Sequence, residues 1–182
     1  YIGHKREDGK VQKLSDHLNG VADLAEVFAE EYGAGEHAHR TGLMHDLGKY
    51  GAKAQRRQED PEHVAKTDHS TAGTKEAVKL GDAIAAFAIA GHHGGLMNSG
   101  SKMASIAHDG TLWGRLKAQI DEDYYVYKRE IELKPGVYPP KWLRGDDFAA
   151  SFYTRMLFSC LVDADFLDTE AFMADEAAPR GN

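Results

Sequence analysis

The sequence predicts an all-α domain, and three observations support this fold class. Apolar residues recur at helical spacing in several stretches, the first of them between Leu14 and Glu31. Glycines and helix-capping residues divide the chain where these stretches end. No stretch alternates persistently between apolar and polar residues, the pattern of a half-buried strand. The 182 residues suffice for one domain with a single core.

Six segments are expected to be helical. The last of them is apolar on most faces, with Phe148 and Phe152 among its residues, so we expect it to be central. Ser70 and Asp82 are expected to cap the third and fourth segments. In chain order, the six are residues 14–31, 36–47, 70–79, 82–90, 111–130 and 146–167.

Two stretches are expected to lie outside helices. Residues 50–68 are polar, lack a strong period and contain Pro61, which indicates a loop. Residues 130–142 contain several prolines and are expected to form an inserted loop or a short hairpin. We expect a single domain over residues 1–176, followed by a tail or linker at residues 177–182.

The composition is that of a soluble globular protein. No apolar run reaches the ~20 residues that cross a bilayer, and the N-terminus lacks a secretory pattern, so no membrane partner is expected. Cys160 is the single cysteine, which excludes an internal disulfide and a Cys-x-x-Cys zinc site and favours a cytoplasmic location.

The net charge of −7 argues against general attraction of nucleic acid. A local basic cluster is nevertheless present at Lys49, Lys53, Arg56 and Arg57.

The chain has ten histidines, and one of them precedes an aspartate in the pair His45-Asp46. Neighbouring residues on a helix point ~100° apart. One metal could therefore take the imidazole and one carboxylate oxygen, while the second oxygen reaches a different metal. The alternative is a structural aspartate paired with N–H groups, because a buried carboxylate needs partners.

Two further segments have the same character. Asp68-His69-Ser70 places a histidine just before an expected helix, and Gly91-His92-His93-Gly94-Gly95 places two where a helix breaks. Each alone could be a solvated helix terminus. His17, on an apolar helical face, could by itself be a core residue. Together, the three segments favour metal binding.

These residues, in this order, resemble the HD-domain metal-dependent phosphohydrolases. More narrowly, they resemble the HD nuclease domain of the CRISPR type I helicase-nuclease, which degrades DNA marked by the Cascade complex. The resemblance spans about residues 4–170 and implies a helical HD bundle. It is carried by Leu14-Ser15-Asp16-His17-Leu18, His45-Asp46-Leu47-Gly48-Lys49, Asp68-His69-Ser70, Gly91-His92-His93-Gly94-Gly95 and Leu161-Val162-Asp163-Ala164-Asp165-Phe166.

The resemblance implies two metal ions. His17, His45, Asp46 and a late aspartate would hold the first, and His69, His92 and His93 the second, with Asp46 bridging. The late aspartate is Asp163 or Asp165, which cannot both face one metal. Ala164-Asp165-Phe166 matches the family context better, so we choose Asp165.

Two residues are expected to act on the substrate. The resemblance implies that Lys49 contacts a substrate phosphate and acts with Asp46 in catalysis, and that Ser70 also binds substrate. The alternative for Lys49 is an ordinary solvated lysine at a helix end. Of the remaining histidines, His4 resembles a recurrent N-terminal histidine without an assigned role. Four others are expected at the surface, namely His37, His39, His63 and His108.

The implied activity is hydrolysis of phosphodiester bonds of single-stranded DNA in CRISPR interference, an antiviral defence. Two metals ~3.5–4 Å apart suit such hydrolysis by an activated water. Five imidazoles against two carboxylates favour Mn, Fe, Co, Ni or Zn over Mg. The implied partners are single-stranded DNA, a helicase domain in the same or a separate chain, and the Cascade complex. Endonuclease and exonuclease action both stay open. The alternatives are a phosphohydrolase of nucleotides or cyclic dinucleotides, and a non-catalytic domain that docks DNA or a partner.

Overall fold

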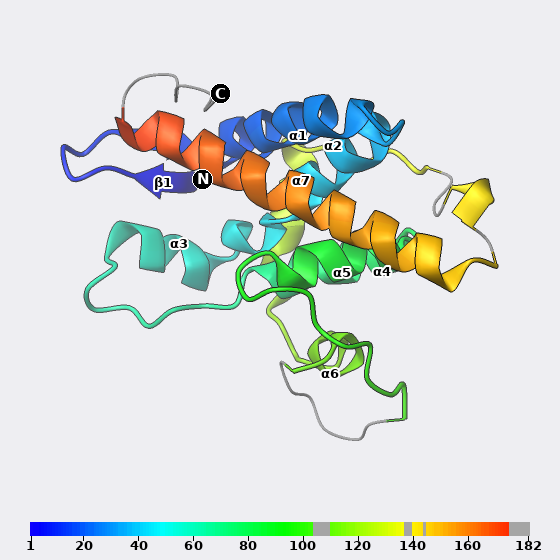
Figure 1. The fold of residues 1–182 in the computed structure, drawn as a ribbon. Coiled ribbons are helices and arrows are strands. Elements are labelled where there is room, and N and C mark those ends of the chain that lie inside the picture. The colour runs from blue at the N-terminus through cyan, green and yellow to red at the C-terminus, as the bar shows by residue number, and fades with distance from the viewer. Residues whose placement is uncertain (104–109, 137–139, 144, 175–182) are drawn as a thin grey trace.

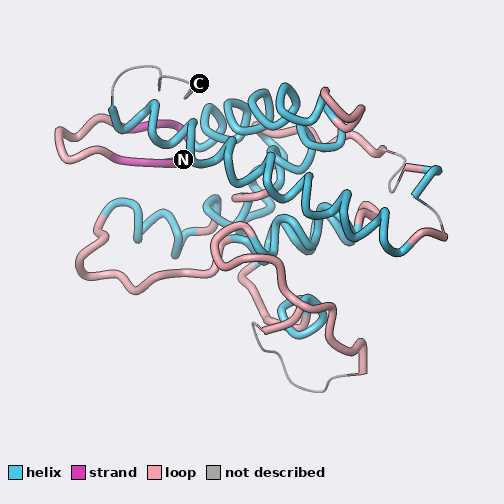
Figure 2. The backbone as a smooth tube through the Cα atoms, in the orientation of Figure 1, coloured by secondary structure: helices cyan, strands magenta, loops and turns pink. Residues whose placement is uncertain are grey.

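The computed structural model describes residues 1–103, 110–136, 140–143 and 145–174. His108 and the expected tail at residues 177–182 lie outside the described residues. The described part is mostly helical, as expected (Figures 1 and 2). Its elements are β1 (Ile2–Lys5), β2 (Val11–Lys13), α1 (Leu14–Glu30), α2 (Gly35–Met44), η1 (Leu47–Tyr50), α3 (Ala52–Glu59), α4 (Ser70–Lys79), α5 (Ala83–Gly91), α6 (Leu112–Leu116), η2 (Glu122–Arg129), η3 (Lys141–Leu143) and α7 (Asp147–Ala174).

The long helix α7 joins two pairs of helices. The pair α1–α2 lies along one side of α7 and the pair α4–α5 along the other (Figure 1). α1 forms because its apolar residues recur every three or four positions, so that one face buries Leu14, Leu18 and Val21 against this interior. None of the described helices is long and apolar enough to span a membrane.

Two glycines let helices approach more closely than other residues would permit. At Gly42 in α2, an added Cβ would lie 2.6 Å from the Cα of Ala22 in α1. At Gly73 in α4, an added Cβ would lie 1.9 Å from the carbonyl oxygen of Met44, at the end of α2. These contacts bring the residues after α2 and those before α4 close together.

The stretch at residues 50–68 is not a loop throughout, because it contains α3. Only Ala54 of this helix is buried, so it has no apolar stripe that periodicity could reveal. Hydrogen bonds hold it in place instead. The side chain of Gln55 accepts from Ile2 N (2.8 Å) and donates to Lys49 O (2.7 Å). The strands β1 and β2, which pair antiparallel, were not expected from sequence because they are only four and three residues long.

The sequence predicted a single helix over residues 111–130, and this prediction was wrong. The structure has two shorter elements there, α6 and η2. In η2, Tyr124 and Tyr127 both donate hydrogen bonds to Glu76 of α4, each at 2.8 Å. Their spacing of three suits a 3₁₀ helix, in which residues i and i+3 share a face. These distant contacts override the local helical pattern. Residues 131–136, in the stretch with several prolines, form an irregular loop.

At the starts of three helices, one expectation is confirmed and two are corrected. Asp82 caps α5 by accepting from Ala85 N (3.0 Å), as expected. α4 begins at Ser70, but Asp68 rather than Ser70 caps it, since its carboxylate accepts from the Ser70 and Thr71 N–H groups, both at 3.1 Å. α7 is central, yet Phe148 and Phe152 near its start are exposed. They share the outward face of the helix, whereas Ala149 packs against the core and Tyr153 is buried.

Candidate metal centre

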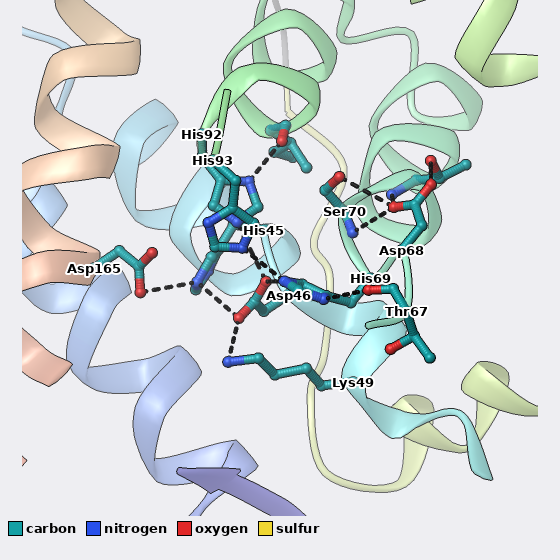
Figure 3. Close-up of polar contacts among 12 residues, drawn as sticks. His45, Asp46, Lys49, Thr67, Asp68, His69, Ser70, His92, His93 and Asp165 are labelled. Atoms are coloured by element: carbon teal, nitrogen blue, oxygen red, sulfur yellow. Dashed lines mark hydrogen bonds and ion pairs between the residues drawn. The ribbon is translucent and has the colours of Figure 1, made fainter. Parts of the chain in front are cut away.

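Side chains from distant parts of the chain converge between the two helix pairs (Figure 3). They are imidazoles and carboxylates, and each lies at or near the end of a helix or on an inward face. The set consists of His17 from α1, His45 and Asp46 after α2, His69 before α4, His92 and His93 after α5, and Asp165 from α7.

Asp46 lies at the middle of this set and is almost fully buried. Its Oδ1 lies 3.3 Å from His92 Nε2 and 3.5 Å from His69 Nε2. Its Oδ2 lies 3.5 Å from His45 Nε2 and 3.8 Å from His17 Nε2. The two oxygens of one carboxylate therefore face two different groups of histidines.

The Oδ2 side, which we call the first set, contains His17, His45 and Asp165. Their ligating atoms all lie within 4.8 Å of one another. Asp165 Oδ1 is 3.4 Å from His17 Nε2 and 3.6 Å from His45 Nε2. Asp163, the alternative from sequence, is exposed. Of the two aspartates, the structure thus brings Asp165 to the histidines.

The Oδ1 side, which we call the second set, contains His69, His92 and His93 together with Asp46. His69 Nε2 and His93 Nε2 are 2.6 Å apart. His92 is buried, whereas His93 is exposed. The second set therefore opens to the surface, while the first set lies inside the bundle.

The geometry of both sets fits bound divalent ions. In the part of the chain that the structure describes, His17 Nε2, His45 Nε2, His92 Nε2 and Asp46 Oδ1 are buried without a hydrogen-bond partner. Such buried polar atoms are costly unless something pairs with them. Two ligands on a tetrahedral ion, each at ~2.0–2.2 Å, are about 3.4 Å apart. The gaps of 3.3–3.8 Å around Asp46 match this spacing.

The outer ring nitrogens are held so that the inner ones can act as ligands. Nδ1 of His45 donates to Gly42 O (2.7 Å), and Nδ1 of His92 donates to Ile89 O (2.7 Å). Nδ1 of His69 donates to Thr67 O (3.1 Å), and that of His17 to Asp168 Oδ2 (2.7 Å). A neutral imidazole that donates from Nδ1 has its lone pair on Nε2. With Nδ1 as the donor, each Nε2 is an acceptor that faces other acceptors, and a cation between them would satisfy this arrangement.

Comparison with protein families adds an independent finding. Residues 14–133 match the family described as HD domain. The chain belongs to the HD-domain family. The matched region carries all the converging residues except Asp165. Membership implies a metal-dependent hydrolase, and HD domains bind divalent metals. No curated protein matched the chain in a sequence comparison.

The electrostatics of the HD site suit metal binding near neutral pH. Burial opposes the charge of Asp46, but Lys49, His45 and His69 outweigh it and hold the pKa of this carboxyl well below its usual range. Burial and the neighbouring His92 lower the pKa of His93 to about 4. Burial also lowers the pKa of His69. Asp46 is therefore ionised and these two imidazoles are neutral at pH 7, which are the forms that bind metal.

Lys49 is not the solvated helix-end lysine of the alternative interpretation. It is 5% exposed, and its Nζ lies 2.7 Å from Asp46 Oδ2 (Figure 3) and 3.5 Å from His4 Nε2. The His4 ring in turn packs edge-on against His17, with ring centroids 4.6 Å apart. Lys49 thus adds a positive charge at the edge of the first set, and the β1–β2 strand pair covers this edge through His4.

Ser70 lies apart from the two sets. Its hydroxyl donates to Asp68 Oδ1 (3.3 Å) and accepts from Arg115 Nη1 (2.5 Å), and the residue is 5% exposed. The expected substrate contact of Ser70 therefore has no support in this geometry. Ser70 instead links the start of α4 to α6.

A hollow of about 520 Å³ adjoins the second set. Its walls carry the cationic side chains of Lys49, Arg57 and Lys66 beside His69 and His93. Of the basic cluster found in the sequence, Lys53 and Arg56 are exposed on α3, the helix whose Ala54 and Arg57 line this hollow. Lys66 was not singled out from sequence because it lies in a polar stretch without a motif.

His37 was expected at the surface, and this expectation was wrong. His37 is 2% exposed, and its Nε2 donates to Asp82 (3.0 Å) while its Nδ1 accepts from Tyr153 OH (2.9 Å). Arg40 also donates to Asp82 (2.6 Å). His39 is partly exposed and His63 is exposed. The buried network ties α2 and α7 to the start of α5, away from the metal ligands.

Replacing His37 with alanine should therefore destabilise the fold without emptying the metal site. The change leaves buried groups on Asp82 and Tyr153 short of one hydrogen bond each, a loss of about 1–3 kcal/mol. Urea unfolding of the metal-free protein measures this loss, and metal analysis tests the site. His63→Ala is the matched control, since His63 is exposed and should leave the free energy of unfolding unchanged. Equal stability of the two variants would contradict the buried network.

Proposed function

We propose that this HD domain is the nuclease domain of a CRISPR type I helicase-nuclease and hydrolyses phosphodiester bonds of single-stranded DNA at two divalent ions. The observation that carries the proposal is Asp46, whose two oxygens face two separate sets of imidazole nitrogens. The order of the motifs around His17, Asp46, His69 and His92-His93 supports the narrower resemblance to this nuclease.

Two ions would share Asp46. His17, His45 and Asp165 would hold the first, and His69, His92 and His93 the second. Bound ions at these positions supply activation of water and neutralisation of charge on the scissile phosphate. The imidazole-rich ligand set favours Mn, Fe, Co, Ni or Zn over Mg, which prefers oxygen ligands.

The protein's own groups would bind and orient the DNA. Lys49 at the site, and Arg57 and Lys66 on the walls of the adjoining hollow, offer positive charge to successive phosphates. Lys53 and Arg56 continue this charge along the exposed side of α3. A basic track of this kind, in a chain of net charge −7, favours a polymer over a single nucleotide. The exposed His93 leaves the second set accessible to such a strand.

A single-stranded substrate must be supplied, and the proposal includes the partners that do so. A helicase domain, in this or a separate chain, would unwind DNA marked by the Cascade complex and feed one strand to the hollow. These partners are proposed from the motif resemblance, and the basic track gives the strand a binding surface.

The test compares substrates under one set of conditions. Protein loaded with Mn²⁺, Co²⁺ or Ni²⁺ is offered single-stranded DNA, deoxynucleoside triphosphates and cyclic dinucleotides. We expect cleavage of the DNA and its loss on chelation. Strong preference for either class of nucleotide would refute DNA as the substrate, and metal binding without any hydrolysis would favour a docking domain.

The double variant Lys53→Gln, Lys66→Gln tests the basic track. Both side chains are exposed, so the variant should fold normally. We expect KM for DNA to rise with little change in kcat. The slope of log affinity against log salt should fall by about 0.7 for each phosphate that the variant no longer neutralises. Lys141→Gln is the matched control, because Lys141 is exposed on η3, which lies at the opposite end of the molecule from α3 (Figure 1). An unchanged KM and salt slope would contradict the track.

A further inference from the structure

The His17 ring differs from the other ligand candidates in what holds its outer nitrogen. Backbone carbonyls accept from Nδ1 of His45, His69 and His92. For His17 the acceptor is a carboxylate, Asp168 Oδ2, at 2.7 Å. The ring is completely buried, while the Asp168 side chain is 15% exposed. His17 is thus backed by a negative charge, and the other three rings are backed by neutral groups.

The position of Asp168 is fixed from three directions. It lies one turn after Asp165 on α7, so one helix face directs Asp165 to Nε2 of His17 and Asp168 to Nδ1. Gln12 of β2 donates to the same Oδ2 from Nε2 (2.8 Å). Gly20 of α1 leaves room for this carboxylate, since a Cβ there would lie 2.2 Å from Asp168 Oδ1.

A carboxylate behind a ligating histidine fixes the tautomer of the ring, sets its orientation and makes the ring a stronger donor to a metal. The geometry of His17 agrees with this arrangement. Asp168 Oδ2 accepts from Nδ1, so the lone pair of Nε2 faces Asp46 Oδ2 and Asp165 Oδ1 on the opposite side of the ring.

We propose that Asp168 is a positioning residue that strengthens metal binding at the first set by orienting and polarising His17, with Gly20 providing the space it needs. The inference rests on the proposed pair of metal positions, and it does not depend on DNA as the substrate. Among the residues that the structure describes, His17 is the one candidate ligand with which Asp168 makes a hydrogen bond, so its effect should be confined to the first set.

The experiment measures Co²⁺ binding to the first set alone. The variant His93→Ala weakens the second set, and equilibrium dialysis with the visible absorption of Co²⁺ then reports the remaining position. In this background, Asp168→Ala should weaken Co²⁺ binding by about 10–100-fold and shift the absorption bands. Asp168→Asn should give a smaller loss, because its amide oxygen still accepts from Nδ1. Asp163→Asn is the matched control, an exposed carboxylate on the same helix, and should change nothing.

Gly20→Ala provides a second, independent approach. It should displace Asp168 without removing its charge and weaken Co²⁺ binding in the same direction, and combining it with Asp168→Ala should add little. Co²⁺ affinity within twofold of the parent in Asp168→Ala would overturn the inference. When Asp168→Ala is made in the parent protein instead, equal weakening of both positions together with lower urea stability of the metal-free protein would also overturn it, because this would indicate a structural role only. If DNA is not cleaved but these affinities change as expected, the inference stands and the proposed substrate fails.

Discussion

Replacing Asp46 with alanine should release both metals and reduce hydrolysis to the level of chelator-treated protein. Each oxygen of this carboxylate faces a different set of histidines, so one substitution removes a ligand from two positions at once. The change also leaves the buried Lys49 ammonium without its carboxylate partner, which adds positive charge where cations must bind. Metal analysis of the purified variant beside a nuclease assay measures both effects.

Variants of the individual sets serve as comparisons for Asp46→Ala. His92→Ala should empty mainly the second position and leave the first partly occupied, because His92 faces only Oδ1. His69→Ala and His93→Ala should likewise empty mainly the second position and leave the first partly occupied. Two retained metals and substantial activity in Asp46→Ala would mean that the shared-carboxylate arrangement is wrong and that the histidines serve another purpose.

Replacing Gly73 with alanine should destabilise the domain although alanine favours helices. An added Cβ would lie 1.9 Å from Met44 O and 2.9 Å from Met44 C, and these backbone atoms cannot rotate away. α4 would have to move from the end of α2, at a cost of about 1–3 kcal/mol or more. This exceeds the gain of about 1 kcal/mol from helix propensity. Because His69 immediately precedes α4, metal binding at the second set should weaken as well.

Urea unfolding of the metal-free protein and Co²⁺ titration measure the two effects of Gly73→Ala. Gly94→Ala is the control for unfolding, because an added Cβ there meets nothing within 4 Å. The Gly94 variant should unfold at the same urea concentration as the parent. A Gly73 variant that matched the parent in both measurements would show that α4 does not depend on this close approach.

The fold class and the start of α1 could be predicted because both follow from local chemistry. The spacing of apolar residues marks the buried face of α1. The cap of α5 was likewise predictable, because the Asp82 side chain itself accepts the hydrogen bond from Ala85 N. α3 could not be predicted, since its fixed position depends on hydrogen bonds from Gln55 to residues of β1 and η1. The break within residues 111–130 likewise depends on Glu76, more than thirty residues earlier in the chain.

The candidate site also had a part that the sequence could predict and a part that it could not. The residues grouped by motif order do converge, because each motif sits at the end or on the inner face of a helix. His37 was placed wrongly because its partners, Asp82 and Tyr153, are remote in sequence. Asp168 carries no motif, and its only signal is a spacing of one helical turn from Asp165. Sequence order can group residues around a metal, but the partners that orient them appear only in three dimensions.

The converging ligands come from residue 17 to residue 165 and so from nearly the whole length of the chain. Ions bound there would act as non-covalent cross-links between α7 and the N-terminal helices. An ion that binds only the folded chain at 100 times its Kd adds about 2.7 kcal/mol to the free energy of unfolding. The melting temperature should therefore depend on the concentration of free metal, and metal depletion should make the chain easier to proteolyse. The supply of metal would then govern how long the protein persists as well as whether it works.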